Sequence, residues 1–146
     1  MADVEADVGP MPAIRSLLAL VGTIVDRLED QGADAVGFRE PIQRGSASGF
    51  VCIEPDPDDP GTLLLVVQLE LLRTPDREQE TFFRHLLRLN REFRGRAAFG
   101  VSEDGMVSLS AGRPITDLDP GEVLDLILWT SEQADLHDDL LAERFS

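Results

Sequence analysis

The sequence predicts a single α+β domain with the element order α-β-β-β-α-β-β-α, in which an antiparallel sheet packs against helices. Three observations support this prediction. Apolar residues recur every three or four positions near the N-terminus, three short apolar segments follow with turn formers between them, and helix-start signals precede two later segments. The chain has 146 residues, an ordinary size for one domain. We expect residues 1–10 to form a flexible acidic N-terminus and residues 11–146 to form the domain.

The first helix is predicted from Ala13 onward, because Pro10 and Pro12 delay its start. Gly32 stands where a C-terminal glycine cap belongs. Between these ends, apolar side chains at helical spacing form one stripe that a docked helix would bury. The stripe consists of Ile14, Leu17, Leu18, Val21, Val25 and Leu28.

Three strands are predicted next, over Ala35–Ile42, Ser48–Glu54 and Thr62–Leu72. The short Gly-Ser-Ala connection and the EPDPDDPG segment between them are rich in turn formers, so the strands should be antiparallel. In the third strand, leucines and Val67 alternate with residues that include Gln68 and Glu70. One face of the sheet should therefore be covered and the other at least partly wet.

The second helix is predicted to open at Thr74-Pro75-Asp76, with threonine as the cap and proline in the first helical position. Its apolar stripe is Phe82, Leu86, Leu89 and Phe93, and Gly95 ends it. Two strands follow, over roughly Ala97–Ser102 and Met106–Ala111. Asp104-Gly105 between them is typical of a tight hairpin turn with positive φ angles.

The last helix is predicted to begin after Asp119, because Pro120 occupies its first position and Glu122 completes a capping box. It should run to about Arg144. The sequence becomes polar after about Ala134, so we expect the end of this helix to project from the body.

The composition limits the classes of partner and the cellular compartment that we expect for this protein. The chain has 13 basic residues, all arginine, against 28 acidic ones, for a net charge of −15. This charge disfavours nucleic acid and anionic membranes; it serves solubility or attracts a basic partner. Cys52 is the only cysteine, the N-terminus lacks a signal-peptide pattern, and no run is apolar enough to span a bilayer. We therefore expect a cytoplasmic protein.

The sequence offers little support for an enzyme. Gly45-Ser46-Ala47-Ser48-Gly49 has alanine where a nucleophile elbow needs serine. His85 and His137 lie on different predicted helices, and Cys52 is expected to be inert packing, although a Cys–His pair is not ruled out. We predict no catalytic residue, no metal site and no cofactor.

Three segments of the second half carry a resemblance to a known family. They are HLLRLN at His85–Asn90, FGVSEDGMVSLSAGRPI at Phe99–Ile115 and DLDPGEVLDLI at Asp117–Ile127. Over roughly residues 80–140 the chain resembles the type III secretion chaperone family and the related YbjN-like proteins. The resemblance implies a chaperone-like domain, a small, acidic, non-enzymatic homodimer that holds an extended segment of a client protein on apolar surface. The alternative is a YbjN-like regulatory or stress-related domain without a dedicated client, and a small enzyme is the third option.

If the resemblance holds, apolar side chains that one layer of helices leaves uncovered would bind the client. The candidates on the first helix and the sheet are Ile14, Leu18, Val36, Phe38 and Phe50. The second helix and the following hairpin are the candidates for the dimer contact, through Phe82, Leu86, Leu89, Phe93 and Phe99. Each of these side chains is equally well explained as ordinary core.

Overall fold

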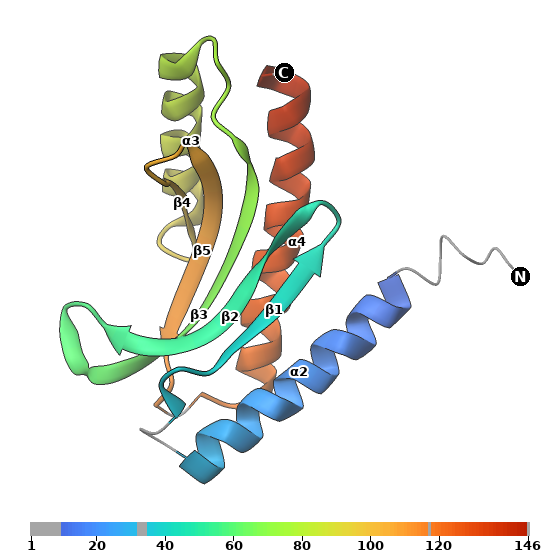
Figure 1. Ribbon diagram of the computed structural model, residues 1–146, viewed down its shortest axis with the longest axis vertical. Helices are drawn as coiled ribbons and strands as arrows, with labels where there is room; N and C mark the ends of the chain where they lie inside the picture. Colours follow the sequence, from blue (N-terminus) through green and yellow to red (C-terminus); the bar gives the residue numbers. More distant parts are fainter. Residues whose placement is uncertain (1–9, 32–34, 117, 146) are drawn as a thin grey trace, which may run out of the picture.

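A computed structural model describes residues 10–31, 35–116 and 118–145, and for residues 10–16, 30 and 31 it describes the backbone only (Figure 1). The elements follow the predicted order α-β-β-β-α-β-β-α, and the strands form one antiparallel sheet in the order β1-β2-β3-β5-β4, which confirms the predicted fold class. The elements are α2 (Pro10–Gln31), β1 (Arg39–Arg44), β2 (Ala47–Asp56), β3 (Asp59–Arg73), α3 (Gln79–Phe93), β4 (Ala98–Val101), β5 (Met106–Pro114) and α4 (Pro120–Phe145).

The helices build one layer against the sheet. α4 runs along it and contacts β1, β2, β3 and β5, whereas α2 packs against α4 beside β1 and α3 packs against β4 (Figure 1). Val51, Val67 and Ala111 are neighbours across three strands and are buried beneath this layer. On the opposite face Gln68 is half-buried and Glu70 is exposed, which confirms the predicted alternation along β3.

The helix start at α2 differs from the prediction. The helix begins at Pro10 rather than Ala13, because proline in the first turn of a helix lacks only an N–H that would have no partner there. The expected flexible segment 1–10 lies outside the described residues except for this proline.

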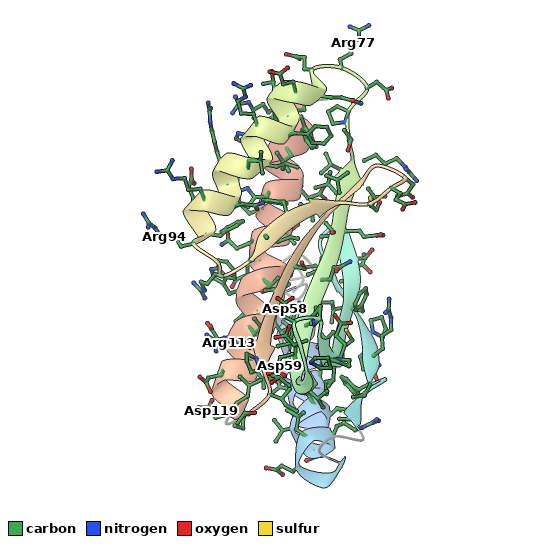
Figure 2. The ribbon with its side chains drawn as sticks, turned by 90° about the vertical axis from the view of Figure 1, so that its left-hand side faces the viewer. Asp58, Asp59, Arg77, Arg94, Arg113 and Asp119 are labelled. Atoms are coloured by element: carbon green, nitrogen blue, oxygen red, sulfur yellow. The ribbon has the colours of Figure 1, made fainter. Side chains whose placement is uncertain are left out.

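Strand boundaries also differ. β1 begins at Arg39 rather than Ala35, since Ala35 to Gly37 form a turn in which the Phe38 N–H donates to the Ala35 carbonyl at 3.0 Å. β2 and β3 continue into the EPDPDDPG segment until only Pro57 and Asp58 remain in the turn. The hairpin is therefore longer than predicted, and Asp58 and Asp59 lie at its tip (Figure 2).

The predicted cap of the second helix is wrong. α3 begins at Gln79, after Glu78 in a left-handed conformation. The Thr74 backbone N–H and hydroxyl instead donate to the Gly105 carbonyl at 2.8 Å and 2.9 Å.

The β4–β5 loop has three residues and ends in a glycine bulge. Gly105 alone has a positive φ in this loop, whereas a two-residue type I′ turn would need two such residues.

The last helix begins where predicted, but its C-terminal end does not project from the body as expected. The Glu122 N–H donates to Asp119 Oδ1 at 2.8 Å, and the Asp119 N–H donates to Glu122 Oε1 at 3.0 Å. Far from projecting, the C-terminal turns pack against α3, where the Phe145 ring meets the Phe82 ring edge-on at 5.0 Å. Leu141 is buried there as well, whereas Asp139, Glu143 and Arg144 are exposed on the outer side of the helix.

Candidate partner-binding site

A groove separates α2 from β1 at one edge of the sheet. It encloses a cavity of about 470 Å³ lined by Leu17, Leu20 and Thr23 of α2, the consecutive residues 40–44 of β1 and Ser131 of α4. Because residues of both alternating sets of β1 line the cavity, it runs along the edge of the strand and not over one of its faces. The groove therefore combines apolar helix side chains with strand backbone.

The free edge of β1 presents unpaired backbone groups to this groove. Within the described residues β1 pairs only with β2, through a hairpin whose two-residue turn is flanked by Arg44 and Ala47. Residues that flank such a turn form a hydrogen-bonded pair, so Glu40, Ile42 and Arg44 direct their backbone groups at β2. Arg39, Pro41 and Gln43 direct theirs outward, which leaves three carbonyls but only two N–H groups, because proline has none.

Contacts between residues far apart in sequence hold the end of β1 in place. Ser46, in the β1–β2 turn, donates a hydrogen bond to the buried Asp138 carboxylate of α4. Arg44 donates to the Ser131 hydroxyl at 3.3 Å and lies 3.9 Å from the Glu132 carboxylate. A side chain at Gly45 would overlap the Asp135 carboxylate, so the turn sits directly on α4. No local sequence signal predicts this contact.

The structure separates the predicted partner-binding residues. Leu18 on α2 is 52% exposed, and Val36 in the turn before β1 is 46% exposed. Phe38 is only 4% exposed and belongs to the core, beneath the Arg27 guanidinium at 5.2 Å. The side chain of Ile14 lies outside the described residues.

Phe50 lies on the opposite face of the sheet from Phe38. It pairs with Pro41, and the Arg39 guanidinium lies 3.6 Å from the centre of its half-buried ring. A shallow hollow of about 610 Å³ surrounds it, with Gln68 and Glu70 among its lining residues. Phe50 is therefore available on the uncovered face but does not join the α2–β1 groove.

The residues predicted for the dimer contact lie largely inside the chain. Phe82, Leu86, Leu89 and Phe99 are buried, and Phe93 is half-buried with its ring 5.6 Å from that of Trp129. A second copy would not reach the four buried side chains in this conformation. The exposed apolar residues of the same region are Phe83, Leu87 and Val101.

Cys52 and the two histidines are the buried or partly buried titratable groups with shifted pKa values in the described part of the chain. Burial, together with Glu54, raises the pKa of the Cys52 thiol to about 11, so it stays protonated. Burial also lowers the pKa of His137, and the positive charge of His85 lowers it further. Among the described residues, no group of three or more His, Cys, Asp or Glu side chains is arranged to hold a metal ion.

No protein-family model matches the chain, and no curated protein matches it. In the described part of the chain, none of the helices combines the length and apolar character needed to cross a membrane. The groove and the free edge of β1 are therefore the features from which a function can be argued.

Proposed function

We propose that this protein is a non-enzymatic, chaperone-like binding module that holds an extended segment of a client protein in the groove between α2 and β1. The observation that carries the proposal is the free edge of β1, which runs beside an apolar helix surface. An added strand gains backbone hydrogen bonds from such an edge, and adjacent pockets select its alternate side chains. The resemblance to type III secretion chaperones and YbjN-like proteins suggests the same class of function.

The groove is lined by both apolar and charged side chains, which suits a client segment in which apolar and polar residues alternate. Leu17, Leu20 and Ile42 supply apolar contacts, whereas Glu40 and Arg44 supply one charge of each sign. Leu18 is exposed on α2 but does not line the cavity. Because Pro41 removes one donor from the edge, affinity must come from side-chain contacts as well as from backbone pairing.

We further propose that the protein acts as a homodimer. β4 is the other edge strand of the sheet, and its Val101 side chain is 43% exposed. This edge belongs to the hairpin that the sequence favours for the dimer contact. Light scattering of the purified protein measures the mass, and a monomer at high concentration would contradict this part of the proposal.

Affinity capture from the native cells, with Thr23→Asp and a matched control, tests the groove directly, because Thr23 is exposed and lines the cavity. Thr23→Asp should reduce the recovered partner about tenfold, since a charge facing the apolar groove would lose its water when the client binds. Thr81→Asp is the control, because Thr81 is also exposed but lies near the start of α3.

Thermal unfolding of both variants should match that of the wild type, because both threonines are exposed. Equal recovery of the partner by the wild type and by Thr23→Asp would contradict the groove as the binding site. A stable protein that captures no partner would instead favour the YbjN-like regulatory alternative.

A further inference from the structure

The basic residues of this acidic chain are concentrated in one short segment. Residues 77–96 contain six of the 13 arginines and only three glutamates, a net charge of +3. The remaining residues therefore carry a net charge of −18, which together with +3 gives the total of −15. The segment comprises α3 and its two flanking turns, so it forms a basic region on an otherwise acidic molecule.

Three of these arginines share one side of α3, and a fourth follows its last residue. Helical spacing places Arg84, Arg88 and Arg91 away from the buried stripe of Phe82, Leu86 and Leu89, beside the exposed Leu87 and Phe83. Arg94 is the C-cap residue of the helix. We call these six outward residues, four arginines and two apolar side chains, the arginine face. Figure 2 shows Arg94 at the end of α3 pointing away from the sheet, and Arg77 just before the start of the helix.

Three of the four arginines of the arginine face lack an ion pair with a described residue. Arg84 pairs with Glu80 at 2.8 Å, whereas Arg88, Arg91 and Arg94 make no ion pair with any described residue. Leu87 is 68% exposed in the middle of this positive surface, the most exposed large apolar side chain among the described residues. The exposed Leu87 and the three arginines without an ion pair give the arginine face both apolar and positive character.

The positive surface continues past the end of α3 into a cavity of about 250 Å³ that Arg94, Arg96, Arg113 and Trp129 line. The Arg96 guanidinium lies 3.9 Å from the centre of the Trp129 ring, which holds it in place. Its nearest carboxylate, Asp125, is 3.4 Å away, and Glu122 is 3.6 Å from Arg113. The Arg96 contact is a long hydrogen bond and the Arg113 contact is an ion pair, and because each guanidinium has five N–H groups, both retain donors for another carboxylate.

We infer that the arginine face docks an acidic segment of a partner protein that carries an apolar side chain for Leu87. Carboxylates of such a segment would pair with Arg88, Arg91 and Arg94, and guanidinium groups favour this paired geometry. The site lies at the β4 end of the sheet, whereas the α2–β1 groove lies at the opposite edge. The inference therefore does not depend on the proposed client groove.

Charge distinguishes this occupant from the alternatives. A twofold contact between two copies of α3 would place arginine against arginine, which is unfavourable for a self-complementary interface. A long polyanion such as nucleic acid would be repelled by the net charge of −18 that the other residues carry. A short acidic segment avoids both costs, and the exposed Leu87 favours a protein over a phosphate backbone.

Fluorescence anisotropy with a labelled synthetic peptide of glutamate and leucine tests the inference on the full-length protein. We expect saturable binding that weakens as salt is raised. Arg88→Glu combined with Arg91→Glu should weaken it about tenfold, since exposed ion pairs contribute modestly and reversal replaces attraction with repulsion. Arg27→Glu combined with Arg73→Glu changes the net charge equally outside the arginine face and should leave binding unchanged.

Leu87→Ser separates the apolar contribution from the charge. This substitution should weaken the binding of the glutamate–leucine peptide and leave the binding of a leucine-free glutamate peptide unchanged. Thermal unfolding confirms that each variant is folded, and all of the altered α3 side chains are exposed. The inference is overturned by equal peptide binding to both double variants, by tighter binding of a single-stranded oligonucleotide to the same face, or by self-association that the α3 variant abolishes.

Discussion

At the scale of single residues, the histidines at the junction of α3, β4 and α4 are the groups most sensitive to pH. The His137 ring lies 5.7 Å from both the Phe93 and the Phe99 rings, and both contacts are edge-on. His85 lies at the same junction, with Arg144 Nη1 3.5 Å from its Nδ1. Burial lowers the pKa of both histidines below the ordinary value of 6.5. Arg144 and Arg88 lower the pKa of His85 further, whereas Glu92 opposes the shift of both.

The sign of the resulting pH dependence follows from these shifts. The unfolded chain binds protons at these histidines at a higher pH than the folded chain does, so acid favours unfolding. The free energy of unfolding should decline as the pH falls from about 7.5 to about 5. Denaturant unfolding of the wild type and of His137→Phe across this range checks the prediction, because the variant should lose less stability on acidification. Identical pH profiles would show that His137 does not contribute.

Residue-level prediction of the binding site was limited by strand register. Phe38 and Phe50 both look like exposed aromatic candidates in the sequence. The pairing of Phe50 with Pro41 places it on the face opposite Phe38, and Phe38 itself joins the core. Alternation within one strand is visible in the sequence, but the relative register of two strands depends on where the turn closes, which a single strand does not reveal.

At the scale of elements, the capping box at the start of α4 is a local signal that the structure reproduces in full. Asp119→Ala should lower the free energy of unfolding by about 1 kcal/mol, since it leaves the Glu122 N–H without its partner. Asp119→Asn keeps an acceptor oxygen and should retain most of this stability. Chemical denaturation measures both variants, and equal losses for alanine and asparagine would contradict a hydrogen-bonded cap.

Local signals predicted the existence and order of the elements but not every boundary. Thr74-Pro75-Asp76 has the composition of a helix start, yet Thr74 is engaged by Gly105, which is distant in sequence. The end of α4 is polar in composition, yet Leu141 and Phe145 dock it onto its neighbours. In both cases a tertiary contact decides the outcome, and local propensity does not contain that information.

At the scale of the whole molecule, the sheet has two free edges with different surroundings. β1 runs beside α2 at one edge, and β4 packs against α3 at the other edge (Figure 1). The fold class could be predicted from the sequence, whereas the groove could not, because it arises from the packing of α2 against α4 beside β1. Two separate surfaces suit a protein that brings a client and a second partner together.

The most direct test of the central claim is residue-resolved hydrogen exchange on the protein with and without its captured client. Glu40, Ile42 and Arg44 have backbone N–H groups directed at β2, so their exchange should change little. The N–H groups of Arg39 and Gln43 lie on the free edge of β1 and should become protected when a client strand is added. Protection of these two amides would support the α2–β1 groove as the binding site. Unchanged exchange at both, with protection confined to another surface, would contradict it.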